Sequence, residues 1–116
     1  PGAQLRVRPA ISVHDLSYRL EDGRKFLDEG HKVLVVCLFK GRQMAHPEHG
    51  YTVMKQVSTD LNDISKIEMQ ARLQGRRMTM LLSPLPLAQR RAAAKERERI
   101  AREKEIAKER GEDVAG

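Results

Sequence analysis

The fold is decided by the stretch VLVVCLFKGRQMAHPEHG, residues 33–50, where an apolar run gives way to a cationic turn. Residues 33–39 form a continuous β-branched and aliphatic run, which is typical of a strand that is central in a sheet or buried on both faces. Gly41 interrupts this run, and Pro47 suits the first turn of a helix. The stretch therefore predicts a buried strand, a glycine turn and a helix.

Towards the N-terminus, the sequence predicts a short strand followed by a helix. Residues 4–8 alternate in polarity, and the proline that follows ends the strand. Over residues 12–30, leucines recur at helical spacing, with Ser12 placed as the N-cap and Gly30 as the terminator. Gly23 costs about 1 kcal/mol of helix propensity, so it either weakens the helix or marks close packing against the sheet.

Towards the C-terminus, the sequence predicts the second helix and a hairpin. Apolar residues at helical spacing give that helix one apolar face: Tyr51, Met54, Val57 and Leu61. Two strands, residues 66–73 and 76–83, are joined by the turn signal Gln74-Gly75. Alternation predicts one apolar face in each strand, formed by Ile67, Met69, Ala71 and Leu73 in the first and by Met78, Met80 and Leu82 in the second.

The predicted order is β-α-β-α-β-β, which we interpret as an α+β two-layer sandwich. A four-stranded mixed sheet with both helices packed on one face buries all of these apolar stripes. We expect residues 1–84 to form this α/β domain. Residues 85–116 consist almost entirely of Ala, Glu, Lys and Arg, and we expect a charged C-terminal extension that is either an exposed helix or disordered.

Composition restricts the classes of function. The chain has 116 residues with 22 Lys+Arg against 16 Asp+Glu, a net charge of +6. This excess indicates a nucleic acid, an acidic partner or a membrane surface without choosing among them. Aromatic residues make up only 3% of the chain, which argues against a surface that stacks splayed bases. The single cysteine, Cys37, cannot form an internal disulfide and favours a reducing compartment.

The chemistry of catalysis and metal binding finds little support in the sequence. The paired histidines His46 and His49 can face the same way on a helix, but a zinc site needs three or four protein ligands. Cys37 lies in a buried strand, where an inert thiol is expected. The sequence contains no recognisable nucleophile–base arrangement and no phosphate-binding glycine loop. We therefore expect no enzyme activity, no metal and no cofactor.

Basic side chains gather at the two glycine turns and on the first helix, where they can grip phosphates. Guanidinium groups pair two phosphate oxygens at once, and glycine lets a backbone approach a ligand closely. The alternative interpretation is that these are ordinary solvated charges. The candidate RNA-binding or ribosome-binding residues are Arg8, Arg19, Arg24, Lys25, Lys40, Arg42, Gln43, His46, Arg76 and Arg77.

Three segments carry a family signature: HDLSYRLEDGRKFLDEGHKV, FKGRQMAHPEHG and QGRRMTMLLSP. Within them stand Phe-Leu-x-x-Gly at residues 26–30, Gly-Arg-x-Met-Ala-His at 41–46 and Gly-Arg-x-Met-x-Met-x-Leu at 75–82. In this order they resemble the C-terminal domain of bacterial-type translation initiation factor three. The resemblance covers about residues 5–84. Glu21 and Leu38 depart from it, because the family usually has a basic residue at the first position and often has Arg or Thr at the second.

The resemblance implies a function in translation initiation. It implies a monomeric domain that binds the small ribosomal subunit through ribosomal RNA, prevents premature joining of the large subunit and supports selection of the initiator tRNA and start codon. Among the candidates, it implies RNA contacts for Arg8, Arg19, Lys25, Lys40, Arg42, His46 and Arg76. It implies a cytoplasmic or organellar location and no membrane. The alternative is a generic basic RNA-binding or protein-interaction domain without a ribosomal role. Since the chain starts with Pro-Gly, we expect it to be one domain of a longer protein.

Overall fold

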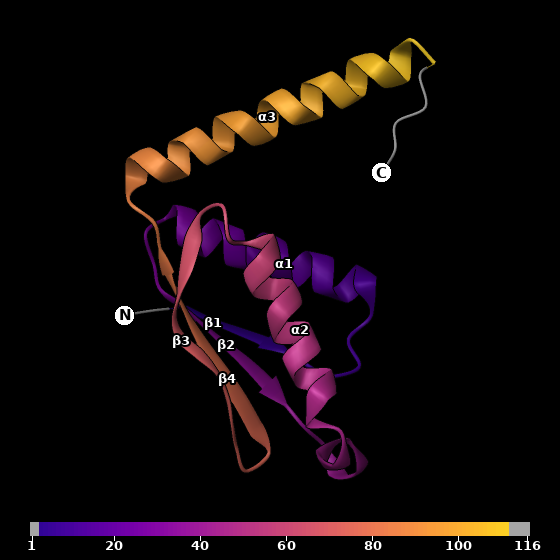
Figure 1. The fold of residues 1–116 in the computed structure, drawn as a ribbon, viewed down its shortest axis with the longest axis vertical. Coiled ribbons are helices and arrows are strands. Elements are labelled where there is room, and N and C mark those ends of the chain that lie inside the picture. Colours follow the sequence, from indigo (N-terminus) through magenta and orange to yellow (C-terminus); the bar gives the residue numbers. More distant parts are fainter. Residues whose placement is uncertain (1–2, 112–116) are drawn as a thin grey trace.

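A computed structural model describes residues 3–111 of the chain as a sheet, two packed helices and a long C-terminal helix (Figure 1). The elements follow in the order β1 (Ala3–Val7), α1 (Val13–Asp28), β2 (Val33–Leu38), the 3-10 helix η1 (Gly41–Ala45), α2 (Pro47–Asp60), β3 (Ser65–Gln74), β4 (Arg77–Pro84) and α3 (Leu87–Glu109). The predicted β-α-β-α-β-β order is confirmed.

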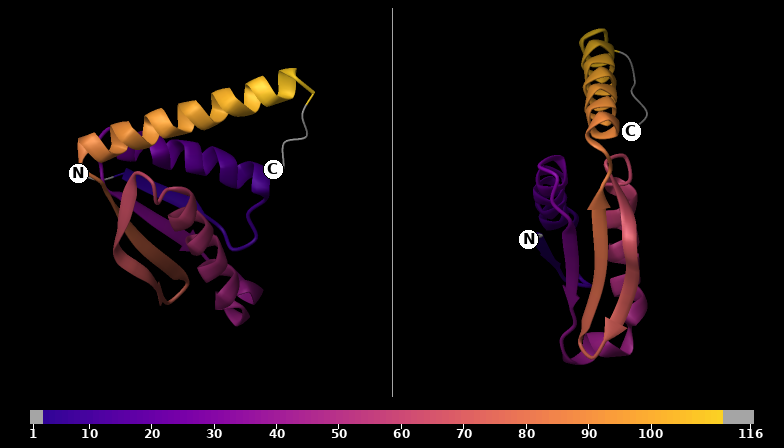
Figure 2. Two further views of the ribbon diagram at one scale, coloured as in Figure 1. Left: turned by 45° about the horizontal axis from the view of Figure 1, so that its top comes forward. Right: turned by 90° about the vertical axis from the view of Figure 1, so that its left-hand side faces the viewer.

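The sheet is mixed and has the strand order β1-β2-β4-β3. β1 and β2 run parallel, with α1 as the crossover between them, whereas β2–β4 and β4–β3 are antiparallel. In the right-hand view of Figure 2, the strands stand in front and α2 lies behind them. The other face of the sheet is left open, as expected for two helices on a single face.

The core fills the space between the helices and the sheet. Leu27 of α1 and Val57 of α2 are wholly buried in one apolar cluster with Val35 and Met78 of the two central strands. Cys37 is buried in the same layer, and its burial raises the pKa of the thiol to about 11. A thiol held protonated in this way is a poor nucleophile, which agrees with the inert role predicted for it.

Two helical glycines are sites of close packing. A Cβ on Gly23 would lie 3.2 Å from Leu61 Cδ1 and 3.4 Å from Leu5 Cδ2, so α1 comes close to β1 at this point. The close-packing interpretation of Gly23 is therefore correct. At Gly50 in α2, a Cβ would lie 2.3 Å from Phe39 Cζ, which leaves no room for any side chain.

One prediction about β3 is wrong. Met69 pairs with Leu81, whose neighbours Met80 and Leu82 are buried under the helices. Directly paired residues point to the same side, so Met69 lies on the open face, and 56% of it is exposed. The cause is the register irregularity on both sides of Met69, which breaks the strict alternation that the prediction assumed.

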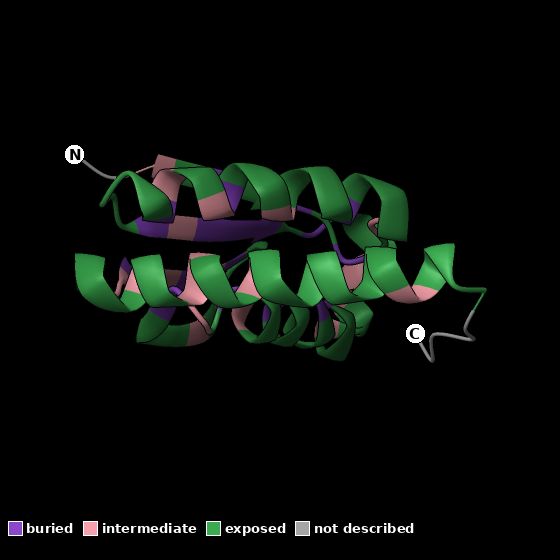
Figure 3. Cartoon of the chain, turned by 90° about the horizontal axis from the view of Figure 1, so that it is seen from above, coloured by how far each residue is buried: buried purple, intermediate pink, exposed green. Residues whose placement is uncertain are grey.

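The charged extension is helical where the structure describes it. Figure 3 shows α3 almost wholly exposed, with only scattered half-buried positions, whereas buried residues concentrate in the sheet below. Ala93 alone among its apolar residues packs against the core as a partly buried side chain. None of the helices described between residues 3 and 111 is long and apolar enough to cross a membrane.

Candidate nucleic-acid interface

The two cationic glycine turns lie next to each other. Leu38, the last residue of β2, pairs with Arg77, and the Phe39 amide donates to the Arg76 carbonyl over 2.8 Å. This pairing places the start of η1 beside the β3–β4 turn, at the bottom of Figure 1. Gly41 and Gly75 both adopt positive φ, at 25° and 62°, and so make the turns possible.

Short hydrogen bonds hold η1 in a defined shape. The Lys40 amide donates to Gln43 Oε1 over 2.8 Å, and the Gln43 amide donates to the Lys40 carbonyl over 2.7 Å. Gln43 is therefore engaged in shaping the turn. The side chains of Lys40 and Arg42 remain exposed on it. Arg76 and Arg77 are exposed on the neighbouring turn, which gives four solvent-facing cations on two adjacent turns.

A second group of cations surrounds a hollow at the carboxyl end of β1. The hollow has a volume of about 370 Å³, and its lining includes Arg8 and Arg19 together with Arg6. Val7, Ile11 and Leu38 provide its apolar lining. Since Leu38 is also the residue that pairs with Arg77, this hollow and the glycine turns share one end of the sheet.

Arg6 is a site residue that the sequence pattern did not single out. It lies in β1, paired with Val36, and is exposed. The sequence pattern could have identified Arg6, because the alternation of residues 4–8 puts it on the same side of the strand as Arg8. Asp15 also lines the hollow and lowers its positive charge.

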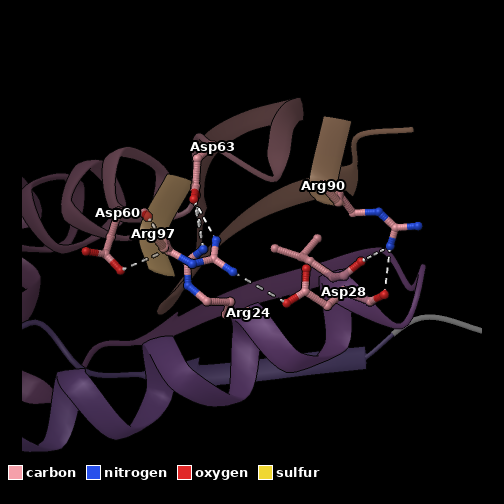
Figure 4. A network of polar contacts seen from close by, with 7 residues as sticks. Arg24, Asp28, Asp60, Asp63, Arg90 and Arg97 are labelled. Carbon is pink, nitrogen blue, oxygen red and sulfur yellow. Dashed lines mark hydrogen bonds and ion pairs between the residues drawn. The ribbon is translucent and has the colours of Figure 1, made fainter. Parts of the chain in front are cut away.

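Arg24 is engaged inside the protein. Its Nη1 donates to both carboxylate oxygens of Asp63 at 3.1 Å, and its Nη2 donates to the Asp60 carbonyl at 2.8 Å. Arg97 of α3 approaches the same Asp63 carboxylate at 2.7 Å, so one carboxylate joins α1, the end of α2 and α3 (Figure 4). This guanidinium therefore has a structural role, and the RNA contact expected of Arg24 stays a prediction.

Lys25 lies away from the two cationic groups. It belongs to the last turn of α1, whereas the hollow lies against the first turns of that helix. Six residues of helix separate Lys25 from Arg19, which lines the hollow, and they rise by about 9 Å. Among the predicted site residues, Lys25 has Arg24 as its neighbour in sequence, and it lies six residues beyond Arg19 on the same helix.

His46 stands where η1 ends and α2 begins. Its Nδ1 lies 2.9 Å from Glu48 Oε1, and its ring stacks on the His49 ring with centroids 5.2 Å apart. The pKa of Glu48 is lowered, first by a hydrogen bond to its own backbone and then by His46. His46, Glu48 and His49 are all exposed.

This arrangement is suited to holding a polyanion. Exposed arginines on rigid turns present planar forks to phosphate oxygens, and the glycines leave the backbone open to close approach. Phosphate contacts of this kind position a protein on RNA without reading its sequence. A Cβ added at Gly41 or at Gly75 would meet no other atom within 4 Å, so each turn is open to solvent.

Comparison with known proteins matches this chain to one family. The family described as "Translation initiation factor IF-3, C-terminal domain" matches residues 3–85. Curated relatives named "Translation initiation factor IF-3" include one from Caulobacter sp. (strain K31), 40% identical over 81 residues, which are 70% of this chain and 47% of the relative. One from Thermus thermophilus is 40% identical over 84 residues, 72% of this chain and 49% of the relative.

A third relative of the same name, from Myxococcus xanthus, is 34% identical over 89 residues, 77% of this chain and 36% of the relative. The chain thus spans about half the length of the Caulobacter and Thermus relatives, and less of this one. The match to the family ends at residue 85, so α3 lies beyond it.

Proposed function

This chain belongs to the translation initiation factor IF-3 family, and on that premise we propose that it binds the small ribosomal subunit through its RNA. The observation that carries this proposal is the adjacency of the two glycine turns, which puts Lys40, Arg42, Arg76 and Arg77 on neighbouring exposed positions. Ribosomal RNA offers the phosphates that such a surface takes up.

In the proposed complex, the two cationic groups follow one RNA surface. The turns at Gly41 and Gly75 grip phosphates through their arginines, and the hollow lined by Arg6, Arg8 and Arg19 takes a further stretch of backbone. His46 adds a hydrogen bond to phosphate or sugar. Arg24 contributes indirectly, by holding α1 against the end of α2.

The consequences for translation belong to the same proposal. A domain seated on the small subunit excludes the large subunit by steric overlap and supports selection of the initiator tRNA and start codon. This action is binding alone and needs no catalytic group. We propose accordingly that the chain is not an enzyme and that it acts as a monomer in the compartment where its ribosomes lie.

The test is co-sedimentation with small ribosomal subunits across a salt series. If about six phosphates are neutralised, the logarithm of the affinity falls against log salt with a slope of roughly −4 to −5. The double variant Arg42→Ala/Arg76→Ala loses two contacts, so its affinity at low salt is reduced and its slope is shallower by roughly 1–2.

The matched control removes two arginines elsewhere. Arg91→Ala/Arg102→Ala changes the net charge by the same amount on exposed positions of α3, and we expect it to leave the salt slope unchanged. Equal losses in both double variants would mean that only net charge matters. Failure of the unaltered chain to bind at low salt would reject the ribosomal function, and binding of free RNA with the same affinity as the subunit would favour the generic RNA-binding alternative.

A further inference from the structure

We propose that His46, Glu48 and His49 form a binding site for a divalent transition metal ion such as Zn²⁺. The three side chains each offer one ligand atom, and these atoms all lie within 4.8 Å of one another. Among residues 3–111, this is the one group of three His, Cys, Asp or Glu side chains that gathers in this way. The site shares His46 with the RNA contact proposed above, whereas Glu48 and His49 belong to the metal site alone.

The expectation of no metal counted two ligands, the two histidines, and the structure brings a third ligand to them. Two histidines are too few for a zinc site, but Glu48 lies between them in sequence and supplies a third ligand. Pro47 starts α2 at this point, so the three residues sit on one tight stretch, at the helix N-cap and in its first turn. Two imidazoles and one carboxylate are a known donor set for open zinc sites.

The distances fit with small side-chain movements. Zinc–nitrogen and zinc–oxygen bonds of about 2.0–2.2 Å place the ligand atoms of a tetrahedral site about 3.3 Å apart. His46 Nδ1 and Glu48 Oε1 are 2.9 Å apart, slightly inside that value, and the widest separation in the group is no more than 4.8 Å. The His46 and His49 rings lie within 16° of parallel, so their nitrogens can turn to the same side.

The surroundings allow this adjustment. The side chains of His46 and Glu48 are 59% and 62% exposed, so they rotate without disturbing the core. The ion takes the place of the proton between His46 Nδ1 and Glu48 Oε1. Three protein ligands leave at least one coordination position open to water.

The nature of the ligands decides which ions bind. Imidazole suits Zn²⁺, Cu²⁺ and Ni²⁺, whereas Mg²⁺ prefers oxygen ligands and keeps its water shell. We expect Zn²⁺ to bind and millimolar Mg²⁺ not to displace it. This preference also distinguishes the site from general attraction of cations to a carboxylate.

The test is calorimetric titration of Zn²⁺ into the chain without a polyhistidine tag. We expect one Zn²⁺ per chain, with shifts of the imidazole resonances of His46 and His49 in NMR spectra. His49→Ala and Glu48→Gln each weaken binding by roughly tenfold or more, since even loss of a group that only supports a ligand costs that much. All three residues are exposed, so these variants keep the fold.

His31→Ala provides the matched control. His31 lies 3.6 Å from Glu29, a His–Glu pair without a third ligand in the group, and we expect its loss to leave Zn²⁺ affinity unchanged. The proposal is overturned if the unaltered chain shows no saturable Zn²⁺ binding. It is equally overturned if His49→Ala and Glu48→Gln bind Zn²⁺ as tightly as the unaltered chain does, or if His31→Ala alone weakens binding.

Discussion

The α/β domain and α3 are held by different kinds of interaction. The domain encloses an apolar core in which Leu27, Val57 and Met78 are completely buried, whereas α3 has no buried residue. Helix α3 instead meets the domain through arginines near its start, and its later turns carry their own ion pairs. Burial of apolar area is the stronger of these two forces, so the domain and the helix differ in how firmly they are fixed.

Two arginines make the polar contacts between α3 and the domain, beside the packing of Ala93. Arg90 Nη1 donates to the carbonyls of Leu27 and Asp28 at 2.8 Å each, at the end of α1. The Leu27 carbonyl also accepts from the Gly30 amide over 3.0 Å. Both carbonyls lie at the negative end of the helix dipole of α1, so a guanidinium is well placed there. Arg97 adds the contact to Asp63 that Arg24 shares (Figure 4). A side chain of α3 thus caps the C-terminal end of α1.

The largest effect is expected from emptying the core. Leu27→Ala removes a wholly buried side chain and should lower the free energy of unfolding by about 2–5 kcal/mol. Urea denaturation monitored by circular dichroism measures this loss. Leu87→Ala is the control at the start of α3, where half of the side chain is exposed, and a similar loss there would contradict the contrast between the regions.

Overfilling the core should have the next largest effect. Gly50→Ala places a methyl group 2.3 Å from Phe39 Cζ and should destabilise the domain by about 1–3 kcal/mol. The thermal midpoint measures this change. Phe39→Leu combined with Gly50→Ala relieves the contact, so the double variant should lose less than the sum of the two single variants. Strict additivity would show that the clash is absent.

Removing the shared carboxylate should loosen α3 without unfolding the domain. Asp63→Asn leaves Arg24 and Arg97 without their common charge, at a cost of about 1 kcal/mol. Amide hydrogen exchange should become faster in the first half of α3 while the strands stay protected. Asp22→Asn, at an exposed position of α1, is the matched control. Unchanged exchange in α3 would mean that Arg90 and Ala93 hold the helix by themselves.

Low pH should loosen α3 in the same way as the Asp63→Asn substitution does. Burial alone would raise the pKa of Asp63, but hydrogen bonds from Arg24 and Arg97 outweigh it and hold the pKa below its ordinary value. A carboxyl with a lowered folded pKa stabilises above its unfolded pKa, and this contribution is lost as pH falls through the folded value. We expect α3 amide resonances to change only below about pH 4. The Asp63→Asn chain should lack this transition.

The smallest effect is expected on the exposed part of α3. Arg99 pairs with Glu96 and Glu103 at helical spacing, and fully exposed pairs of this type contribute little to stability. Arg99→Gln should reduce the helicity of α3 slightly and leave the thermal midpoint of the domain unchanged. A measurable loss in that midpoint would show that α3 and the domain unfold as one unit.

The sequence predicted the domain better than it predicted the site. Periodicity locates the buried stripes because each apolar position independently favours the core, as Met78, Met80 and Leu82 do. Strict alternation failed at Met69, since a register irregularity in a strand leaves no clear mark in the pattern.

Contacts between distant residues were not predictable from local pattern. Arg24 looked like any other exposed cation, and only the fold brings Asp63, 39 residues away, within reach. Arg97 is equally hidden within a run of charges. The sequence analysis counted only His46 and His49 as ligands, and only the geometry brings a ligand atom of Glu48 close to theirs.

The buried thiol provides the protein with its own reporter of opening. Cys37 is the single cysteine of the chain, has no exposed surface and lies in β2, between β1 and β4. A thiol reagent can reach it only when the core between the helices and the sheet opens, so its rate of modification follows the opening of the core and does not report the detachment of α3. Without any added label, the chain can therefore report the stability of its core separately from that of its C-terminal helix.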